Sequence, residues 1–262
     1  MGERSELGAK ARVAMRMLCL WWPDWPVEVA RRGEATPAGG SGSPSPVVVI
    51  ERGCVRSASV EARAVGVRPG LRRREAEARC PGAVVVDADL GEEGRAFEVV
   101  AEAMEALTPK VAIERPGLLF LPTRGPSRRL GGDASLAEAA LKAVRATSSG
   151  QQPCPVRVGV ADGAFAARLA ARRASAGEAF VVEAEGSVDF LAPWPVEVLE
   201  VPALASLLVR LGLPTLGSFA SLSPSVVVSR FGIEGRWAHR RARGLDDEHP
   251  AWRMSPPDLV EG

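Results

Sequence analysis

Residues 17–32, MLCLWWPDWPVEVARR, decide how the chain is organised. The apolar run at the start of this stretch predicts a buried strand. Pro23 and Pro26 end the strand, because proline has no N–H to donate to a sheet. Asp24 then stands where a side chain caps the first turn of a helix. The stretch therefore predicts a strand, a turn and a helix, with one carboxylate at the joint.

Composition is that of a soluble globular protein, with 25% charged and 46% hydrophobic residues among 262. No apolar run approaches the roughly 20 residues of a membrane-spanning helix, so we expect no membrane segment. Residues 1–15 are charged and lack the apolar core of a signal peptide. We therefore expect a disordered leader and a cytoplasmic protein.

The soft metal ligands, cysteine and histidine, are sparse in this sequence. The four cysteines form no C-x-x-C pair, and both histidines lie far from them in the chain. We therefore expect no zinc site. We also expect no other metal and no cofactor. Lysine occurs only at Lys10, Lys110 and Lys142, so clusters of arginine partly reflect a compositional bias.

The remaining hydrophobic pattern predicts an α+β core followed by a helical region. We expect strands at 47–50, 53–58, 83–86, 111–113, 118–121, 156–160 and 180–182. We expect helices at 60–65, 71–79, 91–107 and 164–173, and one that Asp133 or Ser135 caps and that runs to about 146. Two β-α-β elements around a hairpin predict a sandwich of ferredoxin-like type. Low-complexity residues 33–46 predict a flexible loop, and short helices at 204–211, 216–222, 226–231 and 233–243 predict a separate domain.

Several segments occur in an order that points to one family. They are RSASVEARAVGVRPG at 56–70, CPGAVVVDAD at 80–89, LTPKVAI at 107–113, CPVRVGVADGAFAARLAA at 154–171, FLAPWPVEVLEVP at 190–202, LGLPTLGSFASL at 211–222 and RFGIEGRWAHRRARGLDD at 230–247. Together they resemble the Y-family (DinB/UmuC-like) translesion DNA polymerases. The resemblance implies a palm at 16–32 and 91–186, fingers at 33–90, a helical thumb at 187–250 and a tail at 251–262. It also implies that the family's little finger and partner-binding tail are absent from this sequence.

The catalytic carboxylates of the family are missing from the matching positions. Such polymerases hold two Mg²⁺ ions on carboxylates, because magnesium requires hard oxygen ligands. When the family's D-x-D-x-F-F motif is aligned with this chain, Trp21 and Pro23 stand at its acidic positions. When its S-x-D-E motif is aligned, Gly117 and Leu118 stand at the acidic pair. The resemblance therefore implies a protein without nucleotidyl transfer and without a catalytic metal.

The nucleotide-binding residues of the family are also eroded. Its Y-x-x-R motif begins here at Val60 and keeps only Arg63, a residual nucleotide-site residue. Its palm lysine falls at Ala164, and its sugar-excluding aromatic residue falls near Pro26. The family's Gly-x-Gly hairpin, which presents backbone N–H groups to a phosphate, is missing after Pro202.

The string LWWPDWP at 20–26 is similar to one branch of the family, the ImuB-type mutasome subunits. That branch is described as an adaptor joining an ImuA-type RecA-like protein, the sliding clamp and an error-prone C-family polymerase. The resemblance implies these partners, together with primer-template DNA, in SOS-type DNA repair by translesion synthesis. Two alternatives stay open: a weakly active polymerase that uses displaced carboxylates, and an interaction module that never contacts DNA.

Arginine clusters supply the candidate DNA contacts. They are Arg68, Arg72, Arg73 and Arg74 in the fingers, and Arg236, Arg240, Arg241 and Arg243 in the thumb. Each phosphate that such a residue neutralises makes binding more salt-dependent. The alternative is a solvated helix face in an arginine-biased chain, where Glu75 and Glu77 offset the first cluster.

Three tryptophans and three carboxylates near the matching positions have two interpretations each. Trp21, Trp22 and Trp25 either form a partner-binding surface or fill the core; we favour the core for Trp21 and leave the other two open. The displaced carboxylates are Asp24, Glu114 and Asp162. Rather than a rebuilt metal site, we expect Asp24 to cap a helix, Glu114 to face solvent on a hairpin strand and Asp162 to open a turn.

Overall fold

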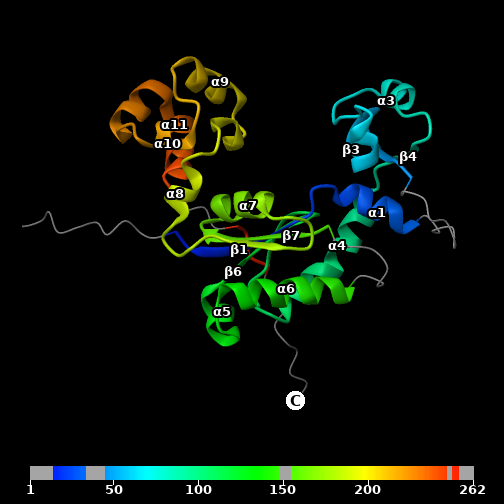
Figure 1. The fold of residues 1–262 in the computed structure, drawn as a ribbon, viewed down its shortest axis with the longest axis horizontal. Helices are drawn as coiled ribbons and strands as arrows, with labels where there is room; N and C mark the ends of the chain where they lie inside the picture. The colour runs from blue at the N-terminus through cyan, green and yellow to red at the C-terminus, as the bar shows by residue number, and fades with distance from the viewer. Residues whose placement is uncertain (1–13, 34–44, 148–154, 247–249, 254–262) are drawn as a thin grey trace, which may run out of the picture. The chain divides into compact units, whose positions relative to one another are not determined.

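The computed structural model describes residues 14–33, 45–147, 155–246 and 250–253 (Figure 1). The predicted leader, the low-complexity loop at 33–46 and the predicted tail lie largely outside these residues. The chain forms two compact units, one of Met1–Trp21, Met104–Glu114 and Leu119–Gly262, the other of Trp22–Ala103 and Arg115–Leu118. The domain boundaries predicted near residues 33, 91 and 187 stay predictions.

A five-stranded sheet of order β5-β6-β1-β7-β8 is the centre of the first unit. Its strands are β1 (Arg16–Trp21), β5 (Ala112–Arg115), β6 (Leu118–Pro122), β7 (Arg157–Asp162) and β8 (Ala179–Val181). β1 pairs antiparallel with β7, and β7 pairs parallel with β8. Residues 17–20 of β1 are all buried, as the apolar run predicts. β5, β6, β1 and β7 have the strand order of a ferredoxin-like fold, which confirms the predicted α+β class.

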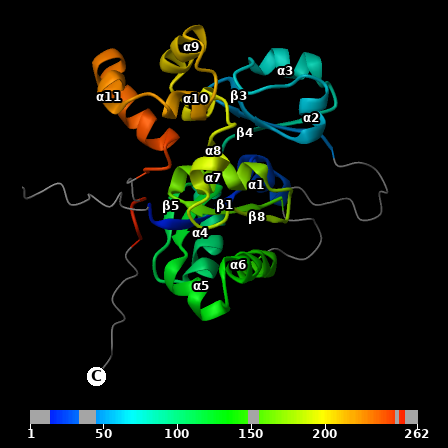
Figure 2. The ribbon, with the colours of Figure 1, turned by 60° about the vertical axis from the view of Figure 1, so that its left-hand side comes forward.

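Helices cover both faces of this sheet. Figures 1 and 2 show α7 (Ala164–Arg173) on one face, and α5 (Arg124–Leu130) and α6 (Asp133–Thr147) on the other. α7 has the bounds predicted for this helix, residues 164–173, and its buried face is made largely of alanine. α5 was not predicted, because its sequence RGPSRRL contains both Gly and Pro, which punctuate most helices.

Arg16 at the start of β1 ties three elements together. Its Nε lies 2.5 Å from Asp133 Oδ2 on α6, and its Nη1 lies 3.0 Å from Asp162 Oδ1 on β7. Its Nη2 also donates to the Val182 carbonyl. Asp133 accepts a second bond from Ser127 Oγ. Asp133, one of the two predicted caps, is the first residue of α6, and its carboxylate bonds Arg16 and Ser127 instead of capping the helix.

This network makes folding sensitive to acid. Burial opposes ionisation of Asp133, but the hydrogen bonds from Ser127 and Arg16 outweigh it, so the pKa of Asp133 lies below its ordinary value. A lowered folded-state pKa stabilises the fold above the unfolded-state pKa of about 4, and the contribution is lost as pH falls through the folded-state value.

We expect Asp133→Asn to lower the free energy of unfolding at pH 7 by about 2 kcal/mol, because bonds to a charged group are replaced by neutral ones. Urea unfolding at pH 7, 5, 4 and 3 tests this. The difference between the variant and the parent chain should narrow below about pH 4, where the parent loses the contribution of the carboxylate. A difference that is constant over this range would contradict the expectation.

The helical region after β8 contains its own small core. Its elements are α8 (Ser187–Leu191), η1 (Val196–Leu199), α9 (Pro202–Arg210), α10 (Leu216–Ala220) and α11 (Pro224–Ala242). A reciprocal capping box between Thr215 and Ser218 starts α10. Gly232 breaks α11 with φ 64° and ψ −154°, which confirms the two predicted helices on either side of it. Among the described residues, no helix has both the length and the apolar character that crossing a bilayer requires.

The second unit contains a three-stranded sheet of order β3-β2-β4. Its strands are β2 (Val47–Glu51), β3 (Cys54–Ala58) and β4 (Val84–Asp87), and its helices are α1 (Trp25–Gly33), α2 (Val60–Ala64), α3 (Arg73–Arg79) and α4 (Leu90–Glu105). The predicted hairpin is confirmed: β2 and β3 are antiparallel and joined by Arg52 and Gly53, both with positive φ. α1 packs on this sheet through Val27, Val47 and Val49. α4 ends before Leu107, which the predicted helix included.

Candidate functional site

A cluster of aromatic rings lies at the start of α1 in the second unit. Trp22 and Trp25 are only 2% and 1% exposed. Their rings meet each other and Phe97 edge to face, with centroids 5.0 to 5.6 Å apart, a geometry that aromatic pairs prefer. The indole Nε1 of Trp25 donates to the Glu93 carbonyl at 3.0 Å. Trp22 and Trp25 are therefore core residues.

Gly117 is packed directly against this cluster. Its carbonyl accepts a 2.8 Å hydrogen bond from the Trp22 N–H. Its φ is +85°, and a Cβ built on it would lie 2.6 Å from Trp25 Cβ. The neighbouring Leu118 is buried at 1% exposure, and Pro23 is half-buried. These three predicted positions hold no side-chain oxygen, and at Gly117 there is no room for one.

Trp21 ends β1 in the first unit and is half-buried rather than fully packed. The guanidinium groups of Arg157 and Arg172 lie 5.6 and 5.7 Å from its ring centroid, within the range of cation–π contacts. The core role that we favoured for Trp21 therefore belongs to Trp22 and Trp25. A strand end exposes one side of its last residue, whereas both other tryptophans lie beneath α4 residue Phe97.

Asp24 does not cap α1 with its side chain, contrary to the prediction. Its Oδ1 lies 2.6 Å from Arg63 Nη1 and accepts from Ser57 Oγ at 3.3 Å. Only its backbone carbonyl serves the first turn of α1, accepting from the N–H groups of Val27 and Glu28. Because Arg63 brings a charge and several donors, it is a stronger partner than a helix N–H. The predicted nucleotide-site residue Arg63 is thus bonded to a displaced carboxylate.

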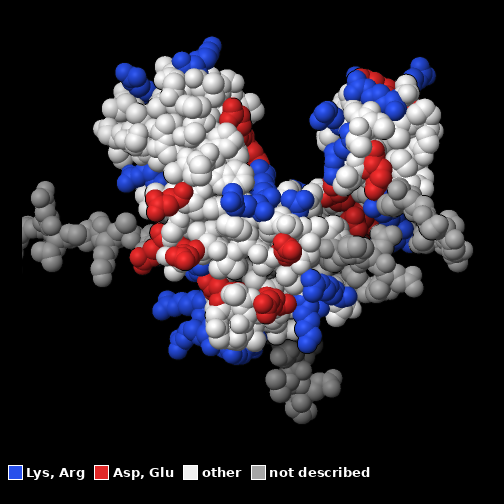
Figure 3. Space-filling model, in the orientation of Figure 1, with Lys and Arg blue, Asp and Glu red and all other residues white. Residues whose placement is uncertain are grey.

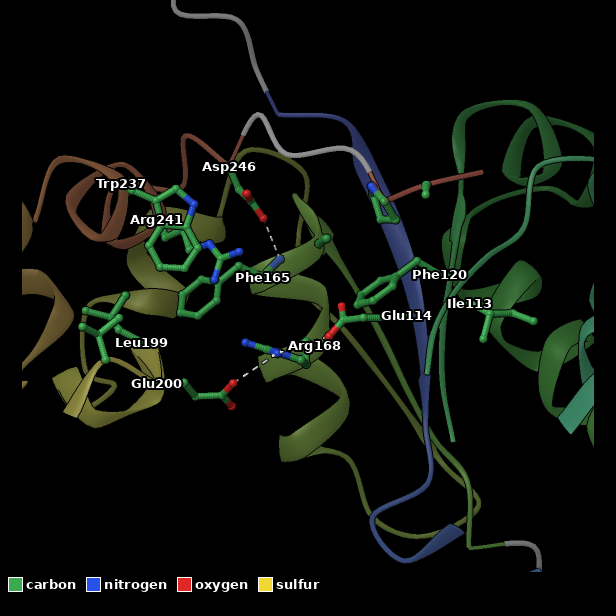
Figure 4. Close-up of a pocket in the computed structure, with 14 residues that line it drawn as sticks. Ile113, Glu114, Phe120, Phe165, Arg168, Leu199, Glu200, Trp237, Arg241 and Asp246 are labelled. Carbon is green, nitrogen blue, oxygen red and sulfur yellow. Dashed lines mark hydrogen bonds and ion pairs between the residues drawn. The ribbon is translucent and has the colours of Figure 1, made fainter. Parts of the chain in front are cut away.

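A cavity of about 570 Å³ opens in the first unit between α7, α11 and the β5–β6 hairpin (Figure 4). Arg168 extends into it from α7, with Nη1 3.5 Å from Glu200 Oε2 and 3.8 Å from Glu114 Oε1. Glu114 is exposed on β5, as predicted, yet it lies within ion-pair distance of Arg168. Ala164, where the resemblance places the family's lysine, also lines the cavity.

Aromatic rings and guanidinium groups form the other wall of this cavity. Arg241 stacks on Trp237 at 3.6 Å from the ring centroid. The Phe165 ring lies within 5.9 Å of Arg168 and 5.5 Å of Arg241. Sequence reasoning missed Trp237 and Phe165; the only local signal was the i, i+4 spacing of Trp237 and Arg241, which places them on one helix face.

Asp162 ends β7, where it is buried and does more than open a turn. It accepts hydrogen bonds from Ser187 Oγ and from the Glu185 N–H, and pairs with Arg16. Asp24, Glu114 and Asp162 thus each lie within ion-pair distance of an arginine. Over the described ranges, no group of three or more His, Cys, Asp or Glu residues is placed to hold a metal ion.

The predicted DNA-contacting arginines differ in how they are engaged. In the second unit Arg68, Arg72 and Arg74 are exposed, whereas Arg73 pairs with Glu77 at 3.1 Å and Asp87 at 3.2 Å. The four in the helical region lie on or just after the last turns of α11. Of these, Arg236 and Arg243 are exposed, whereas Arg240 and Arg241 are half-buried.

A family model and two curated relatives show what the sequence of this chain is similar to. The model of the impB/mucB/samB family matches residues 43–172. "DNA polymerase IV 2" of Mesorhizobium japonicum is 29% identical over 175 residues, which cover 66% of this chain and 41% of that protein. "DNA polymerase IV" of Desulfatibacillum aliphaticivorans is 26% identical over 218 residues, covering 82% of this chain and 52% of that protein. The chain therefore spans about half the length of these curated relatives.

Solved structures share the fold. The crystal structure of DinB from Sulfolobus solfataricus has a TM-score of 0.69 at 19% identity, and the post-insertion binary complex of Dbh DNA polymerase has 0.71 at 18%. Each match covers 90% of this chain and 69% of the other. The ferredoxin-like sheet and the small β3-β2-β4 unit are thus the palm-like and fingers-like parts of a known architecture.

Proposed function

We propose that this chain, a homologue of the Y-family DNA polymerases, does not transfer nucleotides and acts as a DNA-binding adaptor of ImuB type in error-prone translesion synthesis. Its partners in this role would be an ImuA-type RecA-like protein, the sliding clamp and an error-prone C-family polymerase. The observation that carries the proposal is the state of the three displaced carboxylates, each of which an arginine engages.

Arginine pairing opposes metal binding at these positions. A two-metal mechanism needs carboxylates that hold Mg²⁺ ions on both the attacking and the leaving oxygen. Asp24 is 2.6 Å from Arg63, so binding a metal there would require breaking a charge-assisted pair and bringing cations together. At the motif positions themselves, the side chains of Gly117 and Leu118 contain no oxygen that could bind a metal. The ring of Trp21 is in cation–π contact with Arg157 and Arg172.

DNA contact is supported by the exposed cations. Arg68, Arg72 and Arg74 lie together in sequence around the start of α3, unpaired among the described residues. The relatives are DNA polymerases by name, and several solved neighbours are complexes. Three or four phosphate contacts would give a slope of log K against log salt of roughly −3 to −4 on duplex DNA.

A primer-extension assay with Mg²⁺ or Mn²⁺ tests the lack of transfer. We expect no incorporation by the purified chain above a protein-free control, while a DNA polymerase IV included as a positive control extends the same primer. Titration of the labelled primer-template by fluorescence anisotropy at several salt concentrations should show binding with the slope given above.

Each other outcome selects an alternative. Incorporation that Asp24→Ala combined with Glu114→Ala abolishes would identify a weak polymerase that uses displaced carboxylates. Incorporation that survives both changes would refute the proposal, because it would show polymerase activity that does not depend on these two carboxylates. Absence of salt-dependent binding to the primer-template would identify an interaction module that does not contact DNA.

A further inference from the structure

A second and larger cavity, which we call the α5 groove, lies in the first unit beside α5. Its volume is about 1410 Å³, above the roughly 300–1,000 Å³ of pockets that enclose small molecules. It runs between the start of β1, the turn before β5 and the segment from the end of β6 into α5. The size suits a segment of polypeptide rather than a metabolite.

The floor of the α5 groove is partly apolar and its rim is basic. Apolar lining residues are Leu107, Pro109, Pro122 and Pro126, and the rim cations are Lys110, Arg124, Arg128 and Arg129. Figure 3 shows Lys and Arg side chains gathered over the region of α5. Arg124 and Arg128 are spaced i, i+4 on this short helix, where two like charges repel unless an anion lies between them.

The acids that line the groove are already engaged. Asp133 is bonded to Arg16 and Ser127, and Asp246 Oδ2 accepts the Phe165 N–H at 2.8 Å. Lys110, Arg124 and Arg128 form no ion pair with any residue that the structure describes, and Arg129 donates only to the Leu107 carbonyl. The rim therefore carries positive charge that the described part of the chain does not neutralise.

We propose that the α5 groove binds an acidic peptide segment of a partner protein that carries apolar anchor side chains. Arginine clusters recognise acidic motifs through charge-assisted and often bidentate bonds, and the prolines and Leu107 offer contact for the anchors. Duplex DNA fits less well, because a basic face for DNA lies along an extended surface, whereas these cations surround a recess with an apolar floor.

The α5 groove and the cavity beside α7 lie largely on different sides of the first unit. α5 lies on the face of the five-stranded sheet opposite α7 (Figures 1 and 2). The groove and the cavity beside α7 share Asp246 in their linings, and their other lining residues differ. The inference depends on the groove alone and does not require that the chain lack polymerase activity.

The test is selection from a displayed library of random 12-residue peptides against the full chain, followed by anisotropy titration of the most enriched peptide. We expect the enriched peptides to combine Asp or Glu with Leu, Phe or Trp. The double variant Arg124→Glu, Arg128→Glu should bind the selected peptide at least tenfold more weakly. The matched control Arg210→Glu, Arg230→Glu reverses two exposed cations of the same unit outside the groove and should bind as the parent chain does.

Both variants change exposed residues, and circular dichroism checks that each is folded. Hydrogen exchange with and without the peptide should show added protection at residues 107–110 and 122–129. Enriched peptides without acidic residues, or equal weakening by the two double variants, would overturn the proposal. So would a duplex DNA that loses binding on reversal of Arg124 and Arg128 while no peptide is selected.

Discussion

Replacing Gly117 by aspartate is expected to destabilise the fold by about 4 kcal/mol instead of restoring a catalytic carboxylate. Gly117 has φ +85°, a conformation that strains any L side chain by roughly 1–2 kcal/mol. The new Cβ would lie 2.6 Å from Trp25 Cβ, and the carboxylate would be placed against the buried rings of Trp22, Trp25 and Phe97, which offer a charged group no compensation. Urea unfolding of Gly117→Asp beside the parent chain measures the loss.

Two matched variants separate the causes. Gly117→Ala adds the Cβ without the charge, so it should keep the steric part of the loss and remove the part due to the carboxylate. Gly131→Asp places the same side chain at φ +90° where nothing lies within 4 Å of the built Cβ, so about 1 kcal/mol is expected. A Gly117→Asp protein as stable as the parent chain would show that the aromatic cluster yields readily.

The prediction bears on the proposal that this position carries no catalytic carboxylate. Trp22, Trp25 and Phe97 occupy the space beside Gly117, and the Trp22 N–H holds the Gly117 carbonyl at 2.8 Å. A carboxylate at this position therefore requires that the packing around it change as well. Under the proposed function we therefore expect that Gly117→Asp alone creates neither a metal ligand nor polymerase activity.

Local sequence pattern predicted most elements well and some side-chain roles poorly. α7 and the β2–β3 hairpin lie where predicted, because their signals are contained in neighbouring residues: an alanine-rich helical repeat, and a glycine turn between strands. The partner of Asp24 could not be predicted in this way, since Arg63 is 39 residues away and the choice between cap and ion pair is made by the fold.

The tryptophans illustrate the same limit. The sequence alone does not show which of Trp21, Trp22 and Trp25 lies at a strand end and which lies beneath a helix. The structure places Trp22 and Trp25 in the core and leaves Trp21 half-buried beneath two arginines of β7 and α7. Those arginines come from residues more than 130 positions along the chain, so only the sheet order brings them together.

Gly159→Ala is expected to destabilise the first unit by more than about 3 kcal/mol, at the upper end of overpacking effects. Gly159 lies in β7 directly beneath α7, and its added Cβ would fall 2.1 Å from the Ala171 N and 2.2 Å from the Ala167 carbonyl oxygen. Both are backbone atoms of α7, so no side chain can turn away and the whole helix must move. Urea unfolding measures the loss.

The control is Gly94→Ala in α4, where nothing lies within 4 Å of the built Cβ. It should stabilise its helix by about 0.5–1 kcal/mol, since alanine restricts the unfolded chain. If Gly159→Ala did not lower the free energy of unfolding either, the close packing of α7 against β7 would be wrong. The site would then be in doubt too, because α7 carries Arg172, which stacks on Trp21, and Arg168, which lies between Glu114 and Glu200.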